Sequence, residues 1–116
     1  MTHPTKLLFI CSMNKCRSRT AEEIFRHTPG YQVKSAGTEP GARIRVSEGL
    51  LGWADHIFVM ERKHRDYLQF KFAEAIAEKP IHCLNIPDDF QFMDPDLIAT
   101  LQTAFEQFQQ RQTKNE

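Results

Sequence analysis

The chain has 116 residues, which is enough for one compact domain spanning residues 1–116 but not for two hydrophobic cores. Its 15 basic and 15 acidic side chains cancel, so the net charge attracts neither nucleic acid nor an anionic membrane. The longest apolar run, residues 7–11, is far shorter than the roughly 20 residues of a membrane span, and residues 1–6 lack secretory-signal features, so we expect a cytoplasmic protein.

The first predicted elements are two strands with a helix between them. Residues 6–10 form a short apolar run after Pro4 that is typical of a buried strand. Residues 20–27 carry apolar side chains at helical spacing and are followed by Pro29, which indicates a helix. Residues 31–35 are predicted to form a second strand.

The second half continues this alternation of strands and helices. Residues 46–53 are predicted to form a short helix, and residues 56–60 a third strand. Residues 61–72 follow as a helix that covers the sheet, and residues 81–86 as a fourth strand. Asp94 precedes a proline and is placed as the N-cap of a last helix. This order predicts an α/β fold of three layers, with a four-stranded parallel, doubly wound sheet flanked by helices.

The chemically informative motif follows the first predicted strand. Cys11 and Arg17 are separated by five residues, and Ser18 follows directly before the predicted helix. A loop of this length can point its backbone N–H groups at a tetrahedral oxyanion, and the helix N-terminus adds partial positive charge. In a parallel sheet, ligands bind at this end of the strands.

Arg17 and Cys11 have complementary parts in the predicted chemistry. The guanidinium of Arg17 can hold two phosphate oxygens while Cys11 attacks the phosphorus, and amide donors and cations favour a thiolate at neutral pH. No cofactor is needed for this reaction. A zinc site is a weak alternative, because no second pair of ligands accompanies Cys11 and Cys16.

The segment from the first strand through Ser18 resembles the signature of the low-molecular-weight protein tyrosine phosphatases, although this chain is shorter in the middle by tens of residues. The family usually has glycine at the position of Met13 and proline at that of Arg19. The resemblance implies hydrolysis of a phosphotyrosine protein or of a small aryl or alkyl phosphate, with phosphate, sulfate or vanadate as bound oxyanions. Neither nucleic acid nor membrane is an expected partner.

Residue roles are implied by this resemblance. Cys11 would form a phosphocysteine, and Ser18 would donate a hydrogen bond to its sulfur. Cys16 could form a reversible disulfide with Cys11. The residues that would bind phosphate are Ser12, Met13, Asn14, Lys15, Cys16 and Arg17, and Asn14 would also hold the loop's shape.

The predicted acid loop lies at residues 86–90. The family has aspartate and proline here, followed by aromatic residues, whereas this chain has two aspartates, so either Asp88 or Asp89 could be the general acid. Asp88 aligns better, and Asp89 and Phe90 are placed in the substrate pocket.

Other polar residues have simpler interpretations. Cys83 is predicted to be a core residue, and the charged residues 61–66 to form a solvated helix face. We interpret the histidine in that run, His64, as an ordinary surface residue.

Two other functions remain open from the sequence. The loop could belong to a binding module for phosphate or a phosphoprotein with little turnover, which the altered Met13 and acid loop would favour. An arsenate reductase is less favoured, because the third strand ends at Met60 and Glu61 without the further cysteines that such enzymes need.

Overall fold

The computed structural model describes residues 3–114, and its four strands form one parallel sheet. The strand order is β2–β1–β3–β4, and the bounds are β1 (Thr5–Cys11), β2 (Tyr31–Gly37), β3 (His56–Val59) and β4 (Ile81–Cys83). The predicted four-stranded parallel sheet is therefore confirmed. Residues 1–2 and 115–116 lie outside the described residues. The predicted domain 1–116 includes both of these ends, and the N-terminal segment 1–6 includes residues 1–2.

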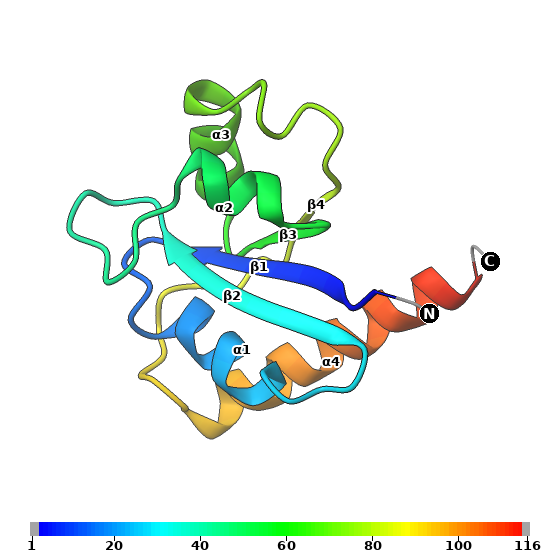
Figure 1. Cartoon of the computed structure of the whole chain (residues 1–116). Helices are drawn as coiled ribbons and strands as arrows, with labels where there is room; N and C mark the ends of the chain where they lie inside the picture. Colours follow the sequence, from blue (N-terminus) through cyan, green and yellow to red (C-terminus); the bar gives the residue numbers. More distant parts are fainter. Residues whose placement is uncertain (1–2, 115–116) are drawn as a thin grey trace.

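Helices cover both faces of the sheet, as Figure 1 shows. One face carries α1 (Arg17–Phe25) and α4 (Pro95–Lys114), and the other carries α2 (Glu48–Trp53) and α3 (Arg62–Lys71). The three predicted layers are thus present. None of the helices within residues 3–114 has the length and apolar composition that crossing a bilayer requires.

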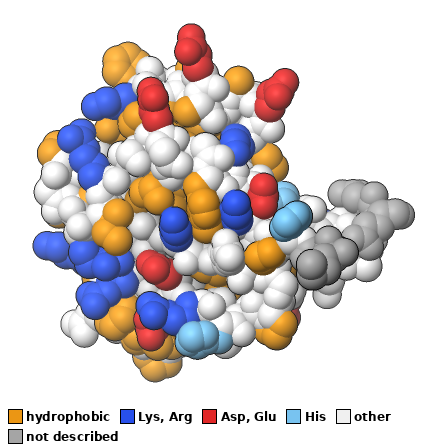
Figure 2. All heavy atoms as spheres, in the orientation of Figure 1, with side chains coloured by type: hydrophobic (Ala, Val, Ile, Leu, Met, Phe, Trp, Pro, Cys, Tyr) orange, Lys and Arg blue, Asp and Glu red, His pale blue; other side chains and the backbone are white. Residues whose placement is uncertain are grey.

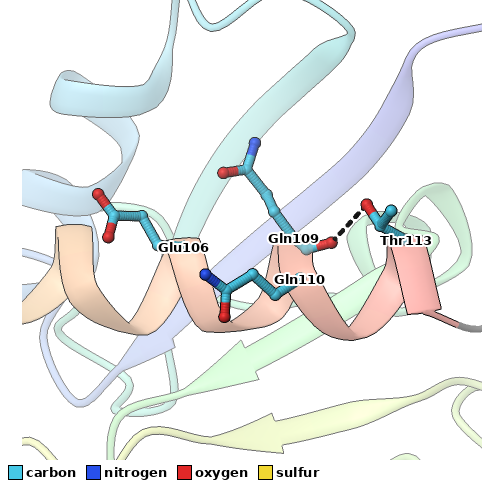
Figure 3. Close-up of a pocket in the computed structure, with 4 residues that line it drawn as sticks. All are labelled: Glu106, Gln109, Gln110 and Thr113. Atoms are coloured by element: carbon cyan, nitrogen blue, oxygen red, sulfur yellow. Dashed lines mark hydrogen bonds between the residues drawn. The ribbon is translucent and has the colours of Figure 1, made fainter.

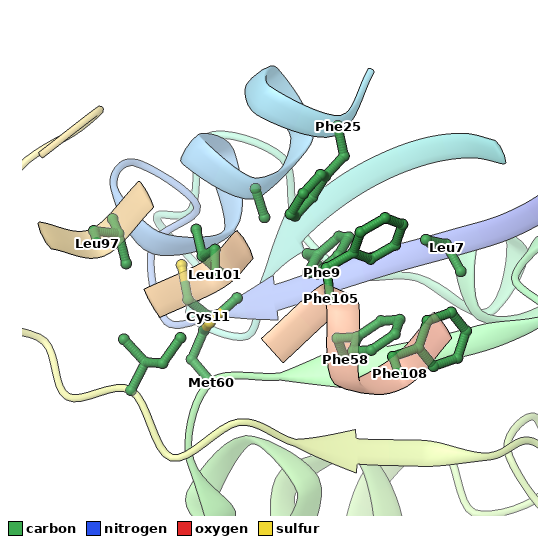
Figure 4. Close-up of a cluster of buried hydrophobic side chains, with 12 residues drawn as sticks. Leu7, Phe9, Cys11, Phe25, Phe58, Met60, Leu97, Leu101, Phe105 and Phe108 are labelled. Atoms are coloured by element: carbon green, nitrogen blue, oxygen red, sulfur yellow. The ribbon is translucent and has the colours of Figure 1, made fainter. Parts of the chain in front are cut away.

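The alternating side chains of β1 supply both halves of the core. Leu7, Phe9 and Cys11 face α1 and α4, where aromatic rings pack around them (Figure 4). Leu8 and Ile10 face α2 and α3. These side chains are at most 3% exposed, and each fully buried Leu, Ile or Phe contributes about 1.5–3 kcal/mol. The burial on both faces fixes the position of the strand end at Cys11.

Two predicted boundaries differ from the structure by three residues, and the other boundaries of these elements differ by less. The first helix begins at Arg17, three residues earlier than expected, so its N-terminus lies directly at the predicted phosphate loop. The fourth strand ends at Cys83 because Asn85 adopts a left-handed φ of 55°, which interrupts extended backbone. The predicted cap of the last helix is confirmed, since the N–H of Asp96 donates to Asp94 Oδ1 at 2.8 Å.

Candidate active site

The loop between β1 and α1 turns its carbonyl groups outward. The carbonyl oxygens of Cys11, Ser12 and Met13 accept backbone N–H groups of residues 38–43, each at 3.0 Å, and that of Asn14 accepts Arg43 Nε at 3.1 Å. In a trans peptide the N–H points opposite to the preceding carbonyl, and the described residues contain no cis peptide. The N–H groups of residues 12–15 therefore point to the inner side of the loop.

Asn14 holds this loop in shape from below. It adopts a left-handed φ of 58°, which Asn tolerates better than most residues, and its side chain is fully buried. Its amide Nδ2 donates to Ser18 Oγ and Ser35 Oγ, both at 2.8 Å. Ser35 donates in turn to the carboxylate of Glu22. The shaping role that the resemblance assigned to Asn14 agrees with these contacts.

Gly37, the last residue of β2, allows the loop to approach the sheet. A Cβ atom at this position would lie 2.5 Å from the carbonyl oxygen of Ser12 and 3.0 Å from the nitrogen of Asn14. Both contacts are to backbone atoms, which cannot rotate away as a flexible side chain could. A side chain here would therefore displace the loop.

The loop encloses a cavity of about 180 Å³ at the carboxyl end of β1. Its lining residues are Cys11, Ser12, Met13, Lys15, Cys16, Arg17 and Asp88. The structure therefore brings together five of the six predicted phosphate-binding residues. Asn14, the sixth, does not line the cavity, because its side chain is directed into the buried network below.

The Cys11 sulfur lies within hydrogen-bond distance of two polar groups. The N–H of Asn14 donates to Sγ at 3.3 Å, and Ser18 Oγ lies 3.0 Å from Sγ. Ser18 Oγ accepts the amide of Asn14 at 2.8 Å, and its own proton has two acceptors within reach, the sulfur at 3.0 Å and the carbonyl oxygen of Ala36 at 3.3 Å. Both contacts hold the sulfur at the base of the cavity.

Arg17 is fully buried and is fixed at one end of its guanidinium. Its Nη1 donates to Glu61 Oε2 at 2.6 Å and to the carbonyl oxygen of Ile86 at 2.8 Å. Its buried Nε has no hydrogen-bond partner within residues 3–114, and the nearest carboxylate, Asp88 Oδ1, lies 3.8 Å away. An unpartnered buried N–H at a cavity wall can donate to an anion in the cavity.

The residues of the acid loop lie in different surroundings. Asp88 lines the cavity, whereas Asp89 and Phe90 are not among its lining residues, and their placement in a substrate pocket stays a prediction. Phe90 packs against the core beneath α4 because burying its ring is favourable. Phe92 is 40% exposed and lies under the guanidinium of Arg19, which is 4.4 Å from the ring centroid. The described residues thus place no aromatic ring in the cavity wall.

The interpretation of residues 61–66 as a solvated face is wrong at two positions. Glu61 binds Arg17, and the Arg17 hydrogen bond is the main cause that lowers the pKa of this carboxyl. His64 is 1% exposed and lies 2.9 Å from Ser12 Oγ. Glu61 directly follows a buried strand next to β1, at the sheet edge where ligands bind. That position in the sequence could have indicated that Glu61 belongs to the site.

The three cysteines are free thiols. Cys11 and Cys16 line the same cavity, and a disulfide between them stays a prediction. Cys83 is only partly buried, not a full core residue, because it lies on a short edge strand; its thiol donates to Asn85 Oδ1 at 3.4 Å.

A second hollow lies on the surface, along α4. This hollow of about 400 Å³ is lined by Glu106, Gln109, Gln110 and Thr113 (Figure 3). These side chains include neither a thiol nor a cation, so they do not match an oxyanion. Figure 2 shows Lys and Arg side chains gathered on the side where the loops after β1 and β2 lie.

Comparison with known sequences finds a phosphatase family that is similar to part of the chain. Residues 6–48, which contain the entire cavity loop, match the family described as low molecular weight phosphotyrosine protein phosphatase. A curated relative from Geobacillus stearothermophilus, a protein-arginine-phosphatase, is 28% identical over 96 residues. That alignment covers 62% of this chain and 65% of the relative's length. Residues 6–48 of the chain are thus similar to the low-molecular-weight phosphotyrosine protein phosphatases.

Solved structures share the fold over nearly the whole chain. The YwlE arginine phosphatase from Geobacillus stearothermophilus has a TM-score of 0.69 and 22% identity, covering 97% of this chain and 98% of that one. The tyrosine phosphatase Wzb from Escherichia coli K30 in complex with phosphate has a TM-score of 0.75 and 21% identity, covering 91% and 96%. At these identities the likeness establishes the fold.

Proposed function

We propose that the chain hydrolyses phosphomonoesters by covalent catalysis with Cys11 as the nucleophile. The observation that carries the proposal is the environment of the Cys11 sulfur. It accepts a hydrogen bond from the N–H of Asn14 and lies 3.0 Å from Ser18 Oγ, in a cavity that Arg17 and Asp88 also line. The inward N–H groups of residues 12–15 would stabilise the negative charge of the transferring phosphoryl group.

The first step forms a phosphocysteine. The Cys11 thiolate attacks phosphorus, the bond from phosphorus to the leaving oxygen breaks, and Asp88 gives that oxygen its proton. Arg17 would hold two phosphoryl oxygens through Nε and its free Nη2, because Nη1 is occupied by Glu61 and Ile86.

The second step releases inorganic phosphate. Water attacks the phosphorus, the Asp88 carboxylate accepts the water proton, and the bond between sulfur and phosphorus breaks. The Ser18 hydroxyl, 3.0 Å from the sulfur, would stabilise the departing thiolate. Asp88 leaves the first step as the carboxylate that the second step requires, and its side chain is 68% exposed, so water can reach it.

We propose an aryl phosphate, such as phosphotyrosine in a protein, as the substrate. Lys15 lines the cavity and brings a positive charge to its wall. That charge favours a departing phenolate, which is negative, over a guanidinium, which is not. Phosphoarginine is the second candidate, because a curated relative is a protein-arginine-phosphatase. Turnover of two peptides that differ only in phosphotyrosine or phosphoarginine separates these substrates.

The test of the reaction uses p-nitrophenyl phosphate from pH 5 to 8. Cys11→Ser should abolish turnover yet retain binding of inorganic phosphate, since only the nucleophile is lost. Cys83→Ser is the matched control and should keep full activity, because Cys83 does not line the cavity. Turnover that survives Cys11→Ser would rule out the mechanism. Phosphate binding without turnover in the unmodified protein would favour a binding module.

A further inference from the structure

Two hydrogen bonds determine the tautomer of the buried His64 ring. Its Nδ1 lies 3.0 Å from the backbone nitrogen of Glu61, and a backbone N–H can only donate. Nδ1 must therefore accept, so the proton of the neutral ring is on Nε2. Burial, helped by the charge of Arg17, lowers the pKa of His64 to about 4, which keeps the ring neutral at neutral pH.

This tautomer sets the direction of the next hydrogen bond. His64 Nε2 lies 2.9 Å from Ser12 Oγ, so His64 donates and the serine oxygen accepts. Ser12 lines the cavity beside Cys11. Within the described residues no hydrogen bond other than that with His64 involves Ser12 Oγ, so its hydroxyl proton is available to a ligand in the cavity.

We propose that the Ser12 hydroxyl is an additional side-chain donor to the bound oxyanion and that His64 is its positioning residue. The Ser12 hydrogen bond would supplement the backbone N–H groups of the loop. Its contribution to catalysis rests on the proposed function, whereas its contribution to oxyanion binding can be measured without turnover.

The same short segment also positions Arg17. Glu61 is the N-cap of α3 and His64 is three residues further on, and the two residues form a reciprocal capping box. The Glu61 carboxylate holds Arg17 Nη1 at 2.6 Å, while His64 holds Ser12. The start of α3 thereby supports the phosphate cavity at two points, one on the arginine and one on the loop. The charged groups that face the His64 ring are Arg17, Glu61, Lys63 and Asp88.

The test is a double-mutant cycle on vanadate binding, measured by calorimetry for the unmodified protein, Ser12→Ala, His64→Gln and the double variant. Ser12→Ala should weaken binding about tenfold, as expected for a lost hydrogen bond to a charged ligand. His64→Gln should weaken binding at least about threefold more in the unmodified background than beside Ser12→Ala, because it acts through the serine. His27→Gln, at an exposed position, is the control.

Several results would overturn this inference. A vanadate affinity of Ser12→Ala within about twofold of that of the unmodified protein would exclude the hydroxyl as a donor. Equal effects of His64→Gln on vanadate affinity with and without Ser12→Ala would leave the histidine a structural role only. Nitrogen-15 shifts that place the ring proton on Nδ1 would also contradict it. If the unmodified protein binds vanadate without turnover, the proposed function fails while the cycle still decides this inference. Absence of vanadate binding would overturn both.

Discussion

Arg17 Nη1 lies 2.6 Å from Glu61 Oε2, and this ion pair joins the first residue of α1 to the residue that precedes α3. The Arg17 side chain is 1% exposed and that of Glu61 is 31% exposed. A buried guanidinium needs a countercharge, and Glu61 supplies it on the side away from the free Nε. The pair therefore fixes which N–H groups of Arg17 remain for a ligand.

Replacing Glu61 by Gln should reduce both activity and stability. The buried Arg17 would keep a hydrogen-bond acceptor but lose its countercharge, which should lower the free energy of unfolding by about 1–3 kcal/mol. We expect kcat/KM for p-nitrophenyl phosphate to fall about tenfold or more, because the guanidinium is no longer held in one orientation. Urea unfolding and steady-state kinetics measure the two effects. The exposed Glu74→Gln should change neither, and unaltered kinetics in Glu61→Gln would contradict this role.

Asp88 and Asp89 should differ in their effect on the rate. Only Asp88 lines the cavity, and its Oδ1 lies 3.8 Å from Arg17 Nε. Asp88→Asn should lower kcat by about 10² to 10⁴, the usual contribution of a general acid, and Asp89→Asn should stay within about threefold of the unmodified enzyme. The measurement is kcat for p-nitrophenyl phosphate and for a phosphate ester with a poorer leaving group. Asp88→Asn should lose more activity on the ester with the poorer leaving group. A larger loss in Asp89→Asn would reverse the assignment.

The sequence predicts the sheet and the loop because both depend on local patterns. The apolar run before Cys11 and the spacing from Cys11 to Arg17 are each readable within a few residues. Glu61 and His64 were misread because helical periodicity in a charged segment says nothing about a partner on another element. Their partners, Arg17 and Ser12, are 44 and 52 residues away along the chain.

The acid loop shows the same limit in another form. The residues after the end of a strand have irregular backbone. Their side chains therefore follow no periodic pattern that would predict which way each one points. Asp88 turns to the cavity, whereas Phe90 two residues later packs against the core. The deciding factor is the burial of the aromatic ring under α4, which only the tertiary structure reveals.

Gly37→Ala should damage the site without touching a catalytic group. Its Cβ would meet the Ser12 carbonyl oxygen at 2.5 Å, and the backbone shift that relieves this contact moves the phosphate loop. We expect a loss of about 1–3 kcal/mol in the free energy of unfolding, as for other overpacked sites, with a fall in kcat/KM. Vanadate affinity should fall as well, because the inward N–H groups shift.

The matched control for this change is Gly52→Ala in α2. A Cβ at Gly52 would have no neighbour within 4 Å, and alanine is favoured over glycine in a helix by up to about 1 kcal/mol. This variant should therefore be as stable as the unmodified protein or more stable, with unchanged kinetics. Equal melting temperatures and equal kcat/KM for Gly37→Ala and the unmodified protein would contradict the close approach.

His82 should make the fold sensitive to acid. Its ring stacks on Phe58 at 4.7 Å between centroids, and burial, followed by the charge of His56, lowers its pKa to about 4. The unfolded chain binds this proton near pH 6.5, so the free energy of unfolding should decrease as the pH falls from about 6.5 to about 4, by about 1–2 kcal/mol after allowance for solvent screening. His56 and His64, whose pKa values are also lowered, add to the same loss. Urea midpoints at pH 7 and pH 5 measure this loss of stability.

His82→Phe should lose less stability between these pH values than the unmodified protein, whereas the exposed His27→Gln should lose the same amount. Identical losses in His82→Phe and the unmodified protein would show that His82 does not carry this proton.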